Sequence, residues 1–206
     1  MTMTDKITEI KRKGGVATIK MESGETLRVP SALYLERRLH TGQQMDPDAY
    51  RMYLRERGYP HALEAAMKFL ALRERSEQEV RSRLRRSCYD EGTINRVLDT
   101  LGLHDLVSDR RFAEAWVHAR SRKYGKNRIA QELRIKGIDR QEAETALGTL
   151  SEEDEYRRAV EQAKKLCRKF QNDPKKIAQS LTRKGYHWKL AKDAAEEAVR
   201  LQKQRE

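Results

Sequence analysis

Hydrophobic positions near the start of the chain alternate with polar ones, and from about residue 32 they take helical spacing instead. Ala17, Ile19 and Met21, for example, are separated by single polar residues. Such alternation is typical of strands with one buried face, and two glycine turns divide the region into short segments. We therefore predict a small antiparallel sheet over residues 7–29.

Two helices are predicted to follow the sheet. The first covers about residues 32–40, with Ser31 as its N-cap. The second begins at Asp46 and Pro47, because proline is well tolerated at the first helical position. We expect it to end near Arg57, since the segment 58–60, Gly-Tyr-Pro, should break the chain.

The later part of the chain contains an internal repeat. The matched residues, 48 positions apart, are Ile129 and Ile177, Leu133 and Leu181, and Gly137 and Gly185. A divergent earlier copy has Val80 and Leu84, 49 positions before Ile129 and Leu133. A period of this length indicates stacked supersecondary units, which often grip another macromolecule.

The predicted fold is therefore mainly α: tandem three-helix repeats in an elongated curved array, with a small N-terminal antiparallel β-sheet. We expect residues 1–60 to hold the sheet and its helices. The three repeats are expected at residues 61–105, 106–150 and 151–206, the last with a C-terminal tail. The predicted helix-start signals are Ser76 with Glu79, Asp109, Ser151, and Asp173 with Pro174, and Gly137 and Gly185 are predicted as left-handed C-caps.

The charge of the chain indicates the chemical class of its partner in broad terms. The chain has 44 Lys and Arg against 32 Asp and Glu, a net charge of +12. Residues 106–150 carry +4 and residues 151–206 carry +5, whereas residues 61–105 are neutral. Such a basic excess favours nucleic acid, an acidic protein surface or anionic lipid as partner.

Catalytic and metal-binding patterns are missing from the sequence. The five histidines are scattered without metal-ligand spacing, and no phosphate-binding loop or nucleophile motif occurs. Cys88 and Cys167 suit ordinary reduced residues. Because these patterns are missing, we expect a protein that is not an enzyme and has no cofactor. Because the sequence has no signal segment and no long apolar stretch, we expect it in the cytoplasm.

Clusters of Lys and Arg are the main candidates for partner binding. Loops and helix starts bring cationic side chains and backbone N–H groups together, an arrangement suited to phosphates or carboxylates. The candidate residues are Arg81, Arg85, Arg120, Arg122, Lys123, Lys126, Arg128, Arg134, Lys136, Lys175, Lys176, Arg183 and Lys184. Among the aromatic residues, Phe112 and Trp116 are expected in the core, whereas Tyr124 and Trp188 are more open to contact roles.

Three blocks together resemble the bacterial RecX family of regulatory proteins. They are Ser76-x-x-Glu79-Val80-x-x-x-Leu84, Ser108-Asp109-Arg110-Arg111-Phe112-Ala113, and Gly125-x-x-Arg128-Ile129-x-x-Glu132-Leu133-x-x-Lys136-Gly137-Ile138. The resemblance runs from about residue 7 to 198 and is sharpest over 62–148. One departure is Ser108, where the family often has an acidic residue.

The resemblance implies tandem three-helix repeats that bind RecA, the recombinase that forms filaments on single-stranded DNA. It also implies modulation, mostly negative, of filament growth, ATP hydrolysis, strand exchange and repressor self-cleavage, and so a place in DNA repair, recombination and the SOS response. The expected partners are RecA and its filament, with direct DNA contact left open, and no membrane. The chain is expected to act as a monomer that wedges into the filament groove or caps its growing end. The leading alternative is a sequence-independent nucleic-acid binder, and an enzyme acting on nucleic acid is disfavoured.

Overall fold

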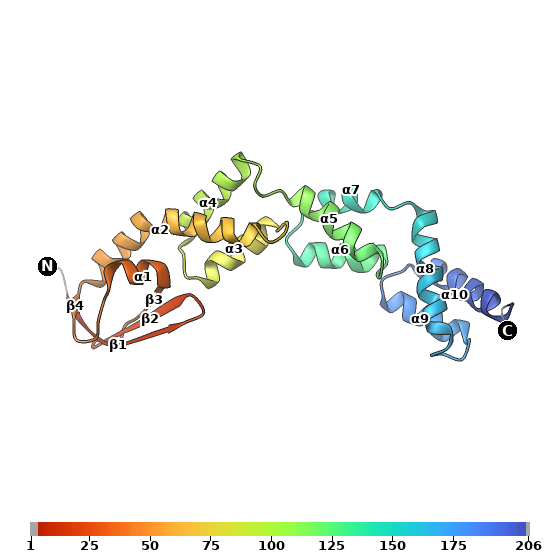
Figure 1. Ribbon diagram of the computed structural model, residues 1–206, viewed down its shortest axis with the longest axis horizontal. Coiled ribbons are helices and arrows are strands. Elements are labelled where there is room, and N and C mark those ends of the chain that lie inside the picture. Colours follow the sequence, from red (N-terminus) through yellow and green to blue (C-terminus); the bar gives the residue numbers. More distant parts are fainter. Residues whose placement is uncertain (1–3, 205–206) are drawn as a thin grey trace. The chain divides into compact units, whose positions relative to one another are not determined.

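The chain divides into two compact units, which meet in sequence at Ser108 and Asp109, and the computed structural model describes residues 4–204 (Figure 1). Unit 1 contains β1 (Asp5–Lys13), β2 (Val16–Met21), β3 (Thr26–Pro30), α1 (Ser31–Arg37), β4 (Gln44–Met45), α2 (Pro47–Leu70), α3 (Glu77–Arg86) and α4 (Glu91–Leu103). Unit 2 contains α5 (Asp109–Ser121), α6 (Lys126–Ile135), α7 (Arg140–Gly148), α8 (Glu152–Cys167), α9 (Pro174–Arg183) and α10 (Trp188–Lys203). The described residues are therefore mainly helical, as predicted.

The N-terminal sheet is antiparallel, with the strand order β3-β2-β1-β4. Gly14 and Gly15 join β1 to β2, and their φ angles of 61° and 86° suit glycine in a two-residue hairpin loop. The alternating residues on one face, Ala17 and Ile19 among them, form a core that also takes in Tyr50 of α2. The predicted sheet is thus confirmed, and β4 is an addition too short to leave a pattern in the sequence.

Helix α2 corrects the prediction of a break at residues 58–60, because it runs without interruption from Pro47 to Leu70. Asp46 is its N-cap, as expected, and accepts hydrogen bonds from the backbone of Asp48 and Ala49. Proline inside a helix costs about 3 kcal/mol. Pro60 is exposed, so water can solvate the carbonyl that loses its partner, and packing at both ends of the helix outweighs the cost.

The start of α1 corrects a second prediction. Its N-cap is Pro30, without a side-chain cap, and Ser31 is the first helical residue. The helix then ends at Arg37, because Arg38 takes a left-handed φ of 48°. The predicted Ser31 cap was wrong because the strand β3 continues up to Pro30, which leaves no extended residue between strand and helix.

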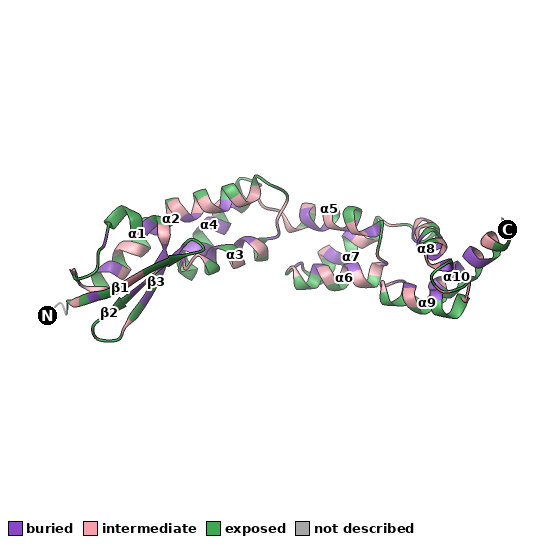
Figure 2. Cartoon of the chain, turned by 60° about the horizontal axis from the view of Figure 1, so that its bottom comes forward, coloured by how far each residue is buried: buried purple, intermediate pink, exposed green. Residues whose placement is uncertain are grey.

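Three helical groups follow one pattern, α2-α3-α4, α5-α6-α7 and α8-α9-α10, and we refer to them as repeats 1, 2 and 3. In each, the apolar pair of the second helix, Val80 and Leu84 in the first, is completely buried in a separate core. Buried positions recur along one stripe of each helix (Figure 2). The first helix of repeat 1 is the C-terminal part of α2, whose N-terminal part packs on the sheet.

The second helix of each repeat also ends in the same way. Gly137 and Gly185 follow α6 and α9 with φ of 83° and 93°. The amide of the next residue, Ile138 or Tyr186, donates to a carbonyl in the last helical turn, the bonding of a Schellman motif. In repeat 1 the left-handed position is filled by Cys88, with a φ of 64°.

Three of the predicted N-caps are also present, whereas Asp109, predicted to precede its helix, is instead the first residue of α5. Ser76, Ser151 and Asp173 each accept a backbone hydrogen bond from the first turn of α3, α8 and α9. Gly125, the N-cap of α6, has no side chain for this purpose. The second helix of repeat 2 therefore lacks the side-chain N-cap that the second helices of repeats 1 and 3 have.

Candidate nucleic-acid or protein interface

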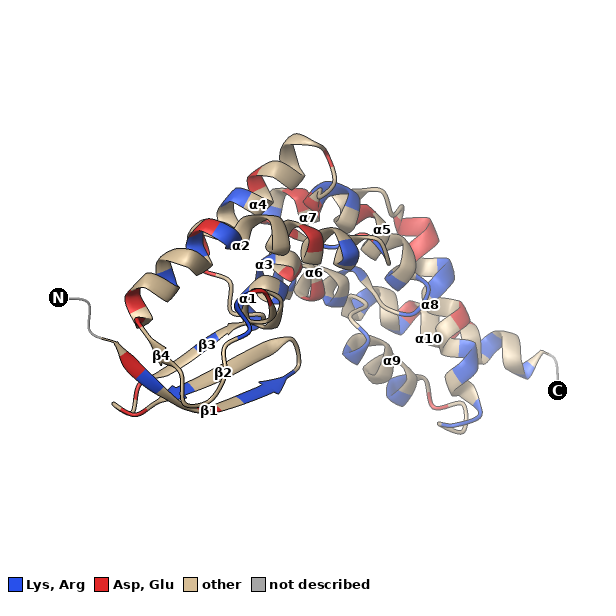
Figure 3. Ribbon diagram, turned by 60° about the vertical axis from the view of Figure 1, so that its left-hand side comes forward, with Lys and Arg blue, Asp and Glu red and all other residues tan. Residues whose placement is uncertain are grey.

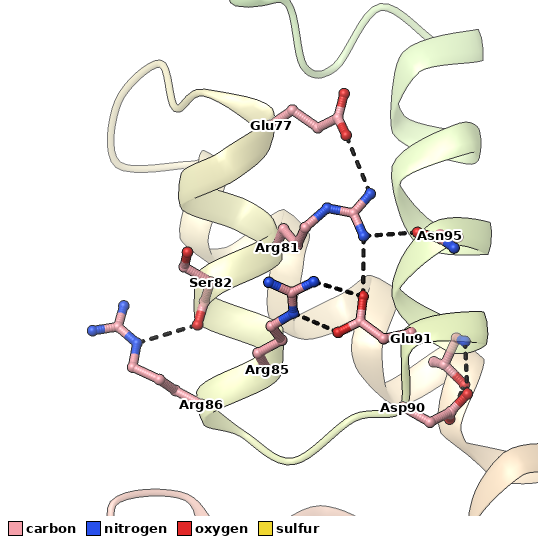
Figure 4. Close-up of polar contacts among 9 residues, drawn as sticks. Glu77, Arg81, Ser82, Arg85, Arg86, Asp90, Glu91 and Asn95 are labelled. Atoms are coloured by element: carbon pink, nitrogen blue, oxygen red, sulfur yellow. Dashed lines mark hydrogen bonds and ion pairs between the residues drawn. The ribbon is translucent and has the colours of Figure 1, made fainter. Parts of the chain in front are cut away.

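The cations predicted on repeat 1 are engaged with carboxylates of the same repeat (Figure 4). Arg81 of α3 bonds Glu91 of α4 at 3.2 Å, Glu77 at 3.3 Å and the side chain of Asn95 at 2.7 Å. Arg85 pairs with the same Glu91 through two nitrogens. These interactions join α3 to α4, so Arg81 and Arg85 already have internal partners and are poorly placed to attract an external anion.

Two of the predicted cations of repeat 2 likewise surround one carboxylate. Arg120 of α5 makes a bidentate pair with Glu132 of α6, at 2.7 and 2.6 Å, and Arg128 reaches the same carboxylate at 3.3 Å. The indole N–H of Trp116 donates to Glu132 at 3.1 Å. The ring centroid of Tyr124 lies 4.4 Å from the guanidinium carbon of Arg120 and 4.3 Å from that of Arg128.

This cluster changes the ionisation of its members in a consistent direction. The hydrogen bonds from Arg120 are the main reason why the pKa of Glu132 lies below its ordinary value. The same pairing raises the pKa of Arg120. Glu132 thus stays ionised and fastens α5 to α6, and the ring of Tyr124 lies close to several cations.

Repeat 3 docks on repeat 2 through backbone hydrogen bonds. The amides of Gly125 and Asn127, at the start of α6, donate to the carbonyls of Lys184 and Gly185, at the end of α9, at 3.0 and 3.2 Å. Opposite ends of two helix dipoles therefore meet, which is electrostatically favourable. A methyl group on Gly125 would collide with the carbonyl of Gly185, so glycine is needed for the close approach.

Two buried side chains of α8 complete this junction. Glu155, 9% exposed, accepts a hydrogen bond from the amide of Lys126 at 2.9 Å and so caps α6 from another repeat. Gln162 donates to the carbonyl of Arg122 at 3.1 Å and accepts from the ammonium group of Lys184 at 2.7 Å. The first turn of α6 is therefore closed by groups from repeat 3.

The junction brings Lys123 of repeat 2 close to Lys165 and Lys184 of repeat 3. We call these three residues and Arg122, the chain neighbour of Lys123 whose carbonyl bonds Gln162, the junction patch. Burial lowers the pKa of Lys184, and repulsion from Lys123 and Lys165 lowers it further. These charges are therefore close enough to repel one another. Arg122, Lys123 and Lys165 are exposed, so an external anion can relieve that repulsion.

Several of the remaining predicted residues have partners within the chain, and the others are exposed. Lys126 faces Glu155, with 4.0 Å between the charged atoms, and Lys176 lies 3.5 Å from Asp173. Lys136 lies over the ring of Trp116 at 5.1 Å. Three others, Arg134, Lys175 and Arg183, are exposed. Basic residues occur on many helices, interspersed with acidic ones (Figure 3), and the junction patch differs because cations of two repeats lie close enough there to repel one another.

Sequence reasoning missed Gly125, Glu155 and Gln162 as junction residues, and it left Lys165 outside the candidate set. The sequence did contain a signal for the role of Gly125. Repeats 1 and 3 have side-chain caps at Ser76 and Asp173, so a glycine at the matching place required another source for the cap. Nothing comparable indicated the two residues of α8, because their role depends on tertiary contacts.

The prediction that Phe112 and Trp116 lie in the core is confirmed. Phe112 is buried and stacks on Trp116, with ring centroids 5.5 Å apart, and both belong to the core of repeat 2. Trp188, at the start of α10, is 49% exposed. Within residues 4–204, no group of His, Cys, Asp and Glu is arranged to hold a metal ion. No helix in this range combines the length and apolar character needed to cross a bilayer.

The fold defines the class: a protein of tandem three-helix repeats, with a basic patch where repeats 2 and 3 meet. Two family models agree with this division, describing the first three-helix domain of RecX over residues 62–101 and the second over residues 108–147. The regulatory protein RecX of Amycolatopsis mediterranei (strain U-32) is 36% identical over 152 residues, which span 70% of this chain and 87% of the relative. The chain belongs to the RecX family of regulatory proteins.

Other relatives extend the likeness over nearly the whole chain. Regulatory protein RecX of Clostridioides difficile (strain 630) is 29% identical over 199 residues, 93% of each protein. The crystal structure of RecX from Lactobacillus salivarius matches with a TM-score of 0.62 and 28% identity, covering 68% of this chain and 96% of that one. A second RecX crystal structure, 24% identical, has the same fold, with a TM-score of 0.62 over 90% of this chain.

Proposed function

We propose that this protein binds RecA and the RecA filament on single-stranded DNA and acts there as a negative modulator. In this proposal it limits filament growth and so reduces ATP hydrolysis, strand exchange and coprotease activity. It acts in the cytoplasm, as a monomer and without a cofactor. Membership of a family of regulatory proteins supports a regulatory role, and the named partner and the direction of the effect are the proposal.

The junction patch is the observation that carries this proposal. Its cations come from two repeats that are fastened together by backbone hydrogen bonds. A fixed surface loses little conformational freedom on binding, which favours affinity for a regular partner such as a filament. Because an acidic protein surface and DNA phosphate both attract such cations, the patch can contact either component of the filament.

A charge-matched pair of variants tests the role of this surface. One variant changes Arg122, Lys123 and Lys165 to alanine, and the control changes Lys189, Lys192 and Lys203, exposed residues of α10, in the same way. Both lose three positive charges. We expect the first to need at least about tenfold more protein to halve RecA ATP hydrolysis on single-stranded DNA, since several ion pairs are lost at once. Equal inhibition by the two variants would reject the junction patch as the binding surface.

Sequence-independent binding of nucleic acid is the second candidate, favoured by the same cations. Salt dependence distinguishes it. About five phosphate contacts to a single strand, each contributing a slope of roughly −0.7, reduce affinity about 100-fold between 50 and 200 mM salt. Binding to RecA with mixed contacts should weaken less. Inhibition that disappears with spare DNA and follows the steep slope would favour this candidate.

A further inference from the structure

The outer edge of β1 is only half covered. Segment 42–45 pairs with the beginning of the strand: the amide of Ile7 donates to Gln43 at 2.9 Å, and the carbonyl of Ile7 accepts from Gly42 at 2.8 Å. Strand β4 pairs with β1 only at Asp5 and Lys6. Among the described residues, no strand pairs with this edge from Thr8 to Lys13.

Backbone groups of two residues point toward this open edge. The two-residue loop at Gly14 and Gly15 is flanked by Lys13 and Val16, which face each other across β1 and β2. Residues that flank such a loop form a hydrogen-bonded pair, and the orientation of the backbone groups alternates along a strand. The N–H and C=O groups of Arg12 and Ile10 therefore face away from β2 and offer two donors and two acceptors.

Positive charge surrounds the same edge. Lys11, Arg12 and Lys13 are consecutive and exposed, and Figure 3 shows basic residues at the arrowhead of β1. Arg12 lies on the side of α1, with its guanidinium 5.9 Å from the ring centroid of Tyr34. Lys11 is on the opposite face and pairs at 2.6 Å with Glu9. Glu9 also pairs with Lys20, so one carboxylate faces two lysines and that face keeps a net positive charge. Both faces of the sheet beside the open edge are therefore basic.

We infer that the open edge of β1 is a docking site for an extended acidic protein segment, which adds to the sheet as a further strand. A peptide backbone matches the edge because it supplies both donors and acceptors, and its carboxylates pair with Lys11, Arg12 and Lys13. Phosphate groups offer acceptors only, so nucleic acid leaves the outward carbonyls unmatched. A second copy of β1 is disfavoured because its own three cations would face these three. The inference is independent of RecA binding.

A dye-labelled peptide tests this on the full chain. The probe has seven residues alternating glutamate with valine, and its binding is followed by fluorescence anisotropy. Two comparison peptides replace glutamate with lysine or carry N-methyl groups along one backbone edge. We expect saturable binding of the glutamate peptide, lost in both comparisons, because one removes charge attraction and the other the strand hydrogen bonds.

Variants of the sheet complete the test. Lys13→Glu should weaken the peptide about fivefold, since one ion pair becomes a repulsion, whereas Arg28→Glu on β3 makes the same charge change away from the edge and should have less than about a twofold effect. Arg12→Pro removes an outward N–H without removing a bond to β2, and should abolish binding while amide spectra show the hairpin intact. No binding at millimolar peptide, binding that survives N-methylation, or equal effects of Lys13→Glu and Arg28→Glu would overturn the inference.

Discussion

Replacing Gly125 by alanine should loosen the docking of repeat 3 on repeat 2. The added methyl group would collide with the backbone at Gly185 and Tyr186, which cannot move aside like a flexible side chain. The φ of Gly125 is −78°, a conformation that alanine adopts without strain, so the expected loss comes from the contact itself. Gly185 is a poorer site for this test because its φ is 93°.

The size of the effect follows from the bonds at the junction. Moving the two backbones apart weakens the hydrogen bonds from Gly125 and Asn127 to repeat 3, each worth about 1 kcal/mol. Buried groups left without partners add about 1–3 kcal/mol, and the lower chain entropy of unfolded alanine returns about 0.4–1 kcal/mol. We therefore expect the free energy of unfolding of unit 2 to fall by about 2–5 kcal/mol.

Urea unfolding followed by tryptophan fluorescence measures this change, because both tryptophans, Trp116 and Trp188, belong to unit 2. Gly148→Ala is the matched control: apart from its chain neighbours and the backbone of its own helix, no atom lies within 4 Å of the added methyl group, and Gly148 ends helix α7. That control should be unchanged or slightly more stable. A Gly125→Ala protein as stable as Gly148→Ala would refute the proposed docking of the two repeats.

Three further changes test other parts of the fold. Cys88→Gly should stabilise unit 1 by about 1 kcal/mol in thermal unfolding, because glycine removes the cost of a left-handed φ of 64°; a lower melting temperature would contradict this. Ser76→Ala should cost about 1 kcal/mol, since it removes the cap that the Glu79 amide donates to at 3.2 Å, and an unchanged urea midpoint would count against the cap. Glu132 has a lowered pKa, so its stabilising contribution is present above the ordinary value of 4.5 and is lost as pH falls below it. Glu132→Gln should therefore flatten the loss of unit 2 stability as pH falls below 4.5, and an unchanged pH profile would exclude this origin.

Repetition made the helical part of the fold predictable. The pair Ile129 and Leu133, followed by Gly137, gives both the buried stripe and the end of the helix, and each feature depends on local spacing. The same local rules predicted the caps at Ser151 and Asp173. Tertiary packing determined what the local rules missed, as when α2 continues through Pro60 with its two ends in different cores.

The sequence predicted which basic residues could form the candidate surface, but not how they are arranged. The sequence identified Lys123 and Lys184 as candidates but could not show that they approach one another. It also could not separate them from Arg81 and Arg120, whose carboxylate partners, Glu91 and Glu132, are distant in sequence. Which cations are neutralised depends on the packing of helices, and the internal ion pairs remove Arg81 and Arg120 from the strongest candidates.

Hydrolysis of ATP by the cognate RecA on single-stranded DNA tests the central claim most directly. This protein is titrated into the reaction near physiological salt, with a parallel series that contains excess single-stranded DNA. Our account predicts inhibition at less than one molecule per RecA subunit that persists in the presence of the excess DNA, because the filament is the target. Unchanged hydrolysis, or inhibition that excess DNA abolishes, would contradict it.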